Sequence, residues 1–506
     1  MRGVVAAGHS VTASAGADVL RAGGNAVDAA VAAVLMSFAS ESLLTGPGAG
    51  GFMLLTSPSG RSHLLDFFVS APGRGLENPD PAPLVPVEVA FSPETIQVFN
   101  VGASSCGAYG NPAGLAYALE QYGTMALGDL TPAAAKAARE GVEVTPIQEY
   151  LLRILGPIFR STPEGTALYE PDGHPVVAGQ RLAMPELADL LDRLGAEGPG
   201  FLYDGDVAAA VSEWVLERGG LLTPQDLADY EVVERAPVGA DFRDRRVLTN
   251  PPPSSGGILI ADALELLDRL DRPGHTETVA EVIAATNRAR DNEFVEGLRS
   301  TDYVQQFLAP GALDRVSGEI GSRLGSTTHI SVMDADGAVA TVTCSNGSSS
   351  GIVVPGTGMH LNNMMGEEDL NPGGFHEHPP GHRVPSMMAP TVVLREGRPE
   401  IALGSAGSNR IRSAIVQTIA AVVDGGMAAQ AAVDSPRVHV EGPLVDAEPG
   451  VDEASLVALQ ARDWEVKRWH ERNLYFGGVQ AVVRDAAGRV TAGGDPRRGG
   501  VAIEVD

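Results

Sequence analysis

With 506 residues the chain can bury a large core, and its 44% hydrophobic and 20% charged content is typical of a globular protein. A net charge of −28 disfavours nucleic acid and anionic membranes as partners, and the most apolar segment, 29–39, is too short to span a bilayer. Cys106 and Cys344 form no CxxC or metal pattern, and the N-terminus lacks the apolar core of a secretion signal, so we expect a cytoplasmic protein without disulfides.

The first two-thirds of the chain is predicted to be mainly helical, with a few short strands. Helical periodicity across 19–38 is interrupted by Gly23-Gly24, and the segment 52–68 is predicted to form a hairpin around Ser57-Pro58-Ser59-Gly60. The stretch 310–324 resembles a linker. The other predicted elements of this part are helices within 112–159 and at 185–194, 207–218, 258–270 and 277–299, and a strand at 247–250.

The segment from Ser326 to Val332 begins a second hairpin. Ile330 and Val332 alternate as in a half-buried strand, 334–337 is a turn, and 338–344 is the returning strand. Thr327 therefore lies at the mouth of a strand, where β-branched residues are the normal strand formers. Its hydroxyl is a nucleophile only if a base lies beside it. One known solution is the α-amino group of the threonine itself, freed by cleavage of the preceding bond.

After this hairpin the pattern changes to strands and glycine turns. We expect helices at 408–423 and 453–462 and closing strands at 478–484 and 500–505. The polar run 345–351 would form the far end of the hairpin begun by Thr327, so that its hydroxyl and amide groups could orient that residue. The run 404–411 leads from a strand into a helix, where backbone N–H groups can hold a developing oxyanion.

Two other patterns favour structural interpretations. Gly46, Gly48 and Gly51 match G-x-G-x-x-G, but a helix precedes them and a strand follows, which is the reverse of the dinucleotide motif. The histidines of the 375–382 loop lack the cysteine or carboxylate partners of a compact metal site. We therefore expect no metal and no cofactor.

Taken together, these segments resemble the γ-glutamyltranspeptidase family of N-terminal nucleophile hydrolases, in order and spacing over nearly the whole chain. In the first part the similar segments are 22–30, 50–53, 231–233 and 252–257. In the second part they are Thr327-Thr328-His329, 358–363, 385–391 and 404–407.

The resemblance implies an α+β fold, a four-layer αββα sandwich, built from one precursor. Cleavage between Ser326 and Thr327 would give a large subunit, 1–326, and a small one, 327–506. Whether these subunits form a further dimer stays open. The α-amine of Thr327 would then serve as the base for its own hydroxyl. Thr343 and Ser345 would orient Thr327, and the backbone amides of Gly407 and Ser408 would form the oxyanion hole.

Departures from the family pattern concern the substrate more than the chemistry. Phe68 stands where the family has an arginine that binds the substrate α-carboxylate, and losing such a pair removes a contact of roughly 1.5–3 kcal/mol. Glu367 could replace an aspartate that binds the α-amino group, Asn346 is the nearest match to a family asparagine, and Ser386 is the second of two serines, the first replaced by Pro385.

The sequence therefore predicts a self-processing amidohydrolase acting on a small-molecule amide through an acyl-Thr327 intermediate. Two alternatives stay open. One is an acylase that removes an acyl group other than γ-glutamyl. The other is a binding protein with the same fold that never matures, which Ser326 in place of an acidic residue before the threonine slightly favours.

Overall fold

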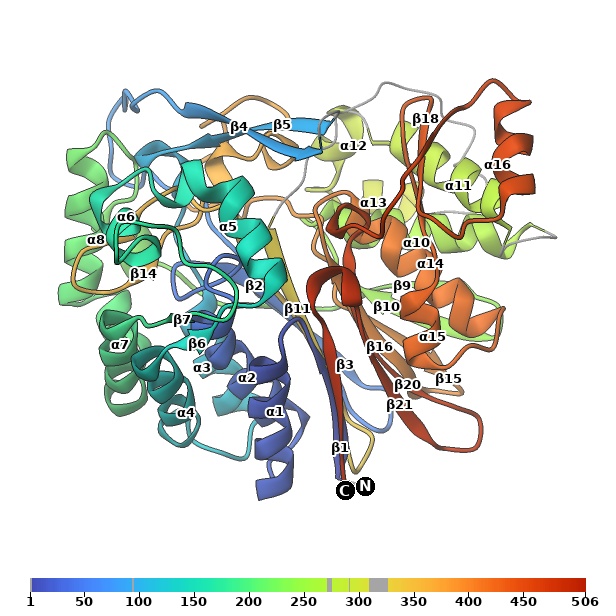
Figure 1. The fold of residues 1–506 in the computed structure, drawn as a ribbon, viewed down its shortest axis with the longest axis horizontal. Coiled ribbons are helices and arrows are strands. Elements are labelled where there is room, and N and C mark those ends of the chain that lie inside the picture. Colours follow the sequence, from blue (N-terminus) through green and yellow to red (C-terminus); the bar gives the residue numbers. More distant parts are fainter. Residues whose placement is uncertain (1, 93–94, 271–274, 291, 309–325) are drawn as a thin grey trace.

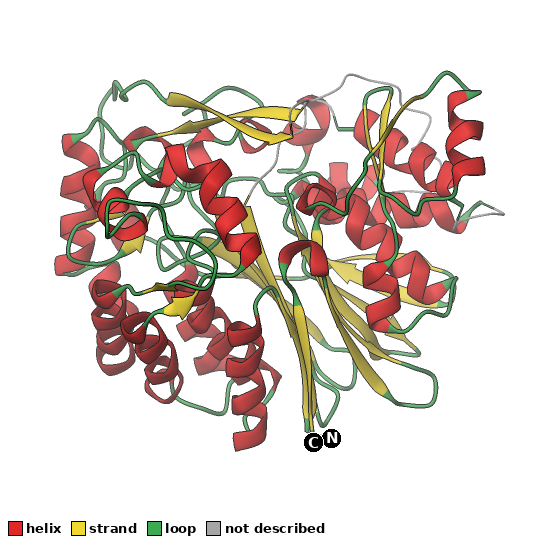
Figure 2. Cartoon of the chain, in the orientation of Figure 1, coloured by secondary structure: helices red, strands yellow, loops and turns green. Residues whose placement is uncertain are grey.

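The computed structural model describes residues 2–92, 95–270, 275–290, 292–308 and 326–506. Two antiparallel sheets pack face to face, and helices cover the outer side of each (Figures 1 and 2). The predicted αββα sandwich is confirmed. The predicted linker, 310–324, lies outside the described residues.

The first sheet contains the Thr327 hairpin at its centre. Its seven strands follow the order β22-β1-β11-β12-β2-β3-β8, so that β11 lies between β1 and β12. In chain order the strands are β1 (Gly3–Ala7), β2 (Gly50–Thr56), β3 (Ser62–Phe67), β8 (Val233–Arg235), β11 (Ser326–Asp334), β12 (Val339–Gly347) and β22 (Val501–Val505). Because β1 pairs with both β11 and β22, the two chain ends lie side by side (Figure 1).

The second sheet faces the first through β16, which contacts both β11 and β12. Its order is β21-β20-β16-β15-β10-β9. The strands are β9 (Val238–Phe242), β10 (Arg245–Thr249), β15 (Thr391–Arg395), β16 (Arg398–Ala406), β20 (Gly478–Arg484) and β21 (Val490–Gly494).

Helices α1 (Ser10–Ala22) and α2 (Ala26–Ser40) cover the first sheet, and α10 (Ser255–Asp268) and α14 (Arg410–Val423) cover the second. The predicted interruption at Gly23-Gly24 is confirmed, because Gly23 ends α1 in the left-handed conformation with φ 94°. Asn25 then caps α2, of which every residue is buried. The remaining long helices are α3 (Asn111–Tyr122), α4 (Leu127–Glu140), α5 (Pro146–Phe159), α7 (Pro185–Glu197), α8 (Asp206–Glu217), α11 (Thr276–Arg288) and α16 (Glu453–Gln460).

The structure departs from the expected elements in two places. The single helix expected over 277–299 is two helices, α11 and α12 (Asn292–Gly297), and between them Arg290 turns inward with an exposed fraction of 3%. Burial of that side chain outweighs the continuous helical pattern. The ribbon β4 (Val85–Ser92) and β5 (Thr95–Val101) was not expected, because Pro86 and exposed apolar residues such as Ile96 obscure its alternation. Among the described residues, no helix is long and apolar enough to cross a bilayer.

Candidate active site

Thr327 occupies an irregular position in the central strand. Ser326 pairs with Gly347 and Thr328 with Cys344, so two residues of β12, Ser345 and Asn346, lie opposite the single residue Thr327 in a β-bulge of β12. Bulges of this kind re-aim a side chain and are common next to active sites. Thr327 is 4% exposed, and its Oγ1 donates a hydrogen bond of 3.3 Å to Ser345 Oγ. The predicted contact between Thr327 and Ser345 is therefore present.

Thr327 lines a small pocket of about 40 Å³ between the two sheets. Its lining combines apolar side chains with hydroxyl and carboxyl groups. The apolar lining residues are Phe68, Met364, Leu370, Met387, Met388 and Ile411, and the others are Thr327, Ser345, Gly347, Glu367, Asp369, Ser386 and Ser408. The structure thus brings together Thr327 with five other residues that the sequence pointed to, namely Phe68, Ser345, Glu367, Ser386 and Ser408.

Thr343 has a different partner from the one expected. Its Oγ1 hydrogen-bonds Nδ1 of His329, the residue directly opposite it, at 2.8 Å. Nε2 of His329 contacts the hydroxyls of Ser331 and Thr341 at 3.0 and 2.9 Å. Burial lowers the pKa of His329 to about 3, so the ring is neutral. His329 is therefore a satisfied core residue between the sheets, although it lies only two residues from Thr327.

Two carboxyl groups face the pocket from the loop after β14 (Met359–His360). Oε1 of Glu367 accepts the Ser348 N–H at 3.1 Å, and Oδ2 of Asp369 accepts the Ser408 hydroxyl at 2.8 Å. Burial and the neighbouring Asp369 raise the pKa of Glu367 to about 7. The pocket therefore holds an acidic pair whose second member was not among the predicted site residues.

The turn between β16 and α14 faces Asp369. Gly407 has φ 118° and Ser408 has φ 52°, a left-handed conformation that is unfavourable for serine. The Ser408 side chain reaches Asp369, while Gly407 packs against Gly477, whose Cα is 3.2 Å from where a Cβ on Gly407 would lie. The strained backbone is held in place by contacts on both sides.

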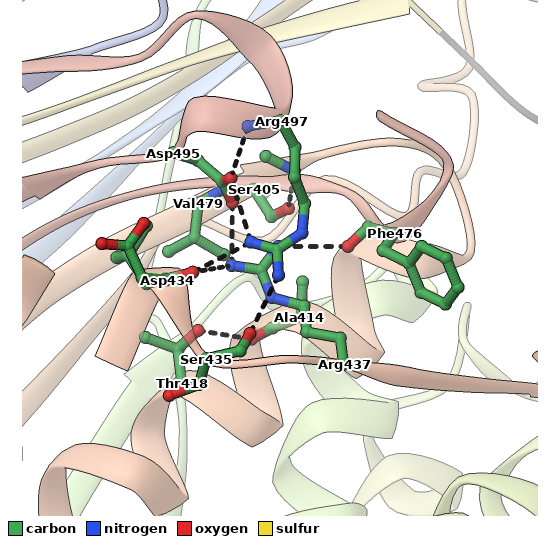
Figure 3. Close-up of polar contacts among 12 residues, drawn as sticks. Ser405, Ala414, Thr418, Asp434, Ser435, Arg437, Phe476, Val479, Asp495 and Arg497 are labelled. Carbon is green, nitrogen blue, oxygen red and sulfur yellow. Dashed lines mark hydrogen bonds and ion pairs between the residues drawn. The ribbon is translucent and has the colours of Figure 1, made fainter. Parts of the chain in front are cut away.

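A buried ionic network contacts the segment that packs against this turn. Figure 3 shows the polar contacts of the network. Asp495 lies between Arg437 and Arg497 at 2.8 and 3.1 Å, and Arg497 also contacts Glu448. The network reaches the segment next to Gly407, because Nη1 of Arg437 donates to the Phe476 carbonyl at 3.1 Å and Oδ2 of Asp495 accepts the Val479 N–H at 2.8 Å. Gly478 in turn donates its N–H to the Ser405 hydroxyl at 3.1 Å.

Phe68 and Ser386 form parts of the pocket wall. Phe68 stacks on Phe52 with ring centroids 5.2 Å apart. Behind it, Arg383 donates to the Phe68 carbonyl at 2.9 Å and to Ser70 Oγ at 2.6 Å, and Nε lies 3.2 Å from Asp66. The Ser386 hydroxyl accepts the Met388 N–H at 3.0 Å.

Two other sequence features lie away from this pocket. The Asn346 side chain is fully buried near Gly46, and its amide has no hydrogen-bond partner among the described residues. It does not line the Thr327 pocket. In the histidine loop, Nε2 of His378 donates to the Leu370 carbonyl at 2.8 Å. No group of three potential metal ligands occurs in the described part of the chain.

Sequence reasoning missed Asp369 and Arg290. Nη2 of Arg290 donates to the Asp369 carbonyl at 2.8 Å, and Nη1 contacts Asn409 Oδ1 at 3.3 Å. Arg290 therefore joins the acidic loop to the Ser408 turn. Asp369 follows Glu367 in an acidic run, which was a usable signal, whereas Arg290 sits in an ordinary helical pattern that carried none.

Glu367 should make stability depend on pH. Its pKa is raised in the folded protein, so the native state binds more protons than the unfolded chain between about pH 4.5 and 7, and stability falls as pH rises through that range. This decrease in the free energy of unfolding should amount to up to about 3 kcal/mol, and we expect Glu367→Gln to abolish it. Urea unfolding at pH 5 and pH 7.5 would measure it, with Glu77→Gln on the exposed surface as control. An unchanged pH dependence in Glu367→Gln would contradict this.

The chain is similar to known proteins over nearly its whole length. Residues 12–505 match the family model for gamma-glutamyltranspeptidase. The chain is 32% identical to an acylase ACY 1 proenzyme from Pseudomonas sp. (strain V22), over 100% of this chain and 94% of that protein. It is 30% identical to a glutathione hydrolase proenzyme from Escherichia coli K12, over 98% and 90%. The crystal structure of a cephalosporin acylase from Bacillus halodurans shares the fold, with a TM-score of 0.80, 24% identity and coverage of 99% and 95%.

The sandwich and its similarity to these proteins define an enzyme of the N-terminal nucleophile hydrolase class. Within that class, the chain belongs to the γ-glutamyltranspeptidase family.

Proposed function

We propose that this protein is a self-processing amide hydrolase whose nucleophile is the hydroxyl of Thr327. The observation that carries the proposal is the position of that hydroxyl. Thr327 lines a pocket opposite a β-bulge of the neighbouring strand β12, its hydroxyl donates a hydrogen bond to Ser345, and Ser408 lines the same pocket.

Maturation begins when Thr327 Oγ1 attacks the carbonyl carbon of Ser326. The C–N bond of that peptide breaks and an ester forms between the two residues. Water then hydrolyses the ester, which leaves Ser326 with a carboxylate and Thr327 with a free α-amine. The two products stay together because β11 pairs with β1 and β12 pairs with β2, and both β1 and β2 belong to the longer product.

In catalysis the α-amine removes the proton from the Thr327 hydroxyl as the oxygen attacks the substrate amide. The backbone amides of Gly407 and Ser408 stabilise the negative charge on the tetrahedral intermediate. The C–N bond breaks, the amine leaves with the transferred proton, and the acyl group remains as an ester on Thr327. Water hydrolyses this ester, which releases the acid and restores the hydroxyl.

Mass spectrometry of the purified protein tests the first step. We expect two chains, 326 and 180 residues long, with Thr327-Thr328-His329 at the start of the shorter one. The cleavage rate should not change with protein concentration, because the reaction is intramolecular. A chain that stays intact on long incubation would instead support the non-maturing binding protein.

The acyl group transferred is the second question. Relatives carry the names glutathione hydrolase and acylase. Phe68 favours an acylase, because it puts an aromatic ring in the wall of the pocket where the family pattern has a carboxylate-binding arginine. Glutathione turnover at a rate close to that of the best non-glutamyl amide would contradict this assignment.

A further inference from the structure

We propose that the Thr327 pocket selects acyl groups that carry no negative charge: the acyl group is apolar, and an ammonium substituent on it is favoured. This inference rests on the proposed function, since it names the substrate class of the same site. It predicts discrimination against γ-glutamyl and glutaryl amides alike.

The charge of the lining residues is the first argument. Glu367 and Asp369 are the ionisable acids of the pocket, and no arginine, lysine or histidine is found among its lining residues. A substrate carboxylate that enters the pocket would therefore lose its hydration without gaining a basic lining residue as partner. It would also lie next to two acidic side chains. Burying an unpaired charge in this way is strongly unfavourable.

The arginines near the pocket do not line it. Arg290 donates to the Asp369 carbonyl and contacts Asn409 Oδ1, and Arg410 and Arg412 interact electrostatically with Asp369 from outside the lining. Arg383 lies behind Phe68 and lines a different cavity, where it contacts Asp66 and the Phe68 carbonyl. None of these guanidinium groups is on the lining, where it could form a bidentate pair with a substrate carboxylate.

The apolar wall is the second argument. Phe68, Met364, Met387, Met388, Leu370 and Ile411 line the pocket and belong to one buried cluster. Methionine side chains adapt their shape to an alkyl chain, so this wall suits hydrocarbon rather than a hydrated charge. Glu367 and Asp369 line the same pocket, where they offer an ammonium group both an opposite charge and hydrogen-bond acceptors.

Four p-nitroanilides separate the contributions of the two substituents. γ-Glutamyl carries an amine and a carboxylate, glutaryl only the carboxylate, 4-aminobutyryl only the amine, and butyryl neither. With the matured enzyme we expect removal of the carboxylate to raise kcat/KM by about tenfold to a hundredfold in both pairs. The 4-aminobutyryl compound should be the best of the four.

Equal or higher kcat/KM for the carboxylate-bearing member of either pair would overturn the inference. If no anilide is cleaved although the chain matures, the proposed function fails for these substrates, and calorimetric binding of the four corresponding primary amides decides the inference separately. Tighter binding of the two carboxylate-free amides supports it. The opposite order, or no binding at all, refutes it.

Variants of the same pocket test the physical cause. Phe68→Arg introduces a cation and should bring the γ-glutamyl to 4-aminobutyryl ratio of kcat/KM close to one or invert it. Phe68→Leu changes shape without charge and should leave the ratio within about threefold. Because Phe68 is 1% exposed, the arginine variant could fail to fold. Glu367→Gln then serves instead, since loss of one acid should bring the same ratio closer to one. An unchanged ratio there would contradict the electrostatic argument.

Discussion

Replacement of Thr327 with alanine is expected to abolish maturation and to lower amide hydrolysis by at least about 10³-fold. Alanine has no hydroxyl to attack the Ser326 carbonyl, so the chain should remain at 506 residues and no α-amine should form at position 327. Both steps use the same oxygen atom, so they should be lost together. Electrophoresis under denaturing conditions and a continuous amide assay measure the two effects.

Two further variants control for this result. Thr327→Ser keeps a hydroxyl and, once cleaved, an α-amine, and should therefore mature and retain measurable activity. Thr249→Ala removes another buried threonine hydroxyl, one that bonds Thr391 at 2.9 Å in the second sheet, and should mature normally. A Thr327→Ala protein that still splits into two chains would show that the nucleophile is elsewhere.

Loss of Asp495 should have the largest effect on stability. Asp495 is fully buried and pairs with Arg437 and Arg497 (Figure 3). Asp495→Asn would leave two buried guanidinium groups with Glu448 as the remaining carboxylate of the network. We expect a loss of about 3–5 kcal/mol, as is typical when one partner of a buried ion pair is removed.

The urea midpoint, read by circular dichroism, measures this loss. The matched control is Asp189→Asn, which removes a carboxylate 2.8 Å from Arg139 where both side chains are largely exposed. That change should cost less than about 1 kcal/mol. Similar losses in the two variants would mean that burial of the network contributes little. Because the network contacts the Phe476–Val479 segment beside Gly407, Asp495→Asn should also slow amide cleavage in the fraction that folds.

Some features of the fold follow from local sequence alone. Gly23-Gly24 separates two helices because Gly23 adopts a backbone conformation that other residues rarely do, and the pattern from Ser326 to Cys344 forms a hairpin because its alternation matches the two faces of a strand. These effects act within a few residues. They are therefore readable without knowing what packs against the segment.

Other features depended on contacts between distant segments. The pattern over 277–299 is continuous, yet Arg290 interrupts it in order to reach Asp369, which lies 79 residues further along the chain. Thr343 was expected to contact Thr327, but the register of β11 and β12 places it opposite His329. A helical or alternating pattern says which face a residue occupies, and it does not say which side chain of another strand lies there.

By itself, the sequence was sufficient to predict the nucleophile candidate and the family, because both depend on ordered motifs, and the resemblance to that family implied the layered architecture. The tertiary structure alone decided what surrounds Thr327. The bulge of β12 opposite Thr327 depends on how two strands pair. The acidic pair of Glu367 and Asp369 and the lack of a basic side chain on the described pocket lining arise from segments far from Thr327 in the chain. Charge and solvation at a site are sums over everything packed around it, so they exist only once the chain has folded.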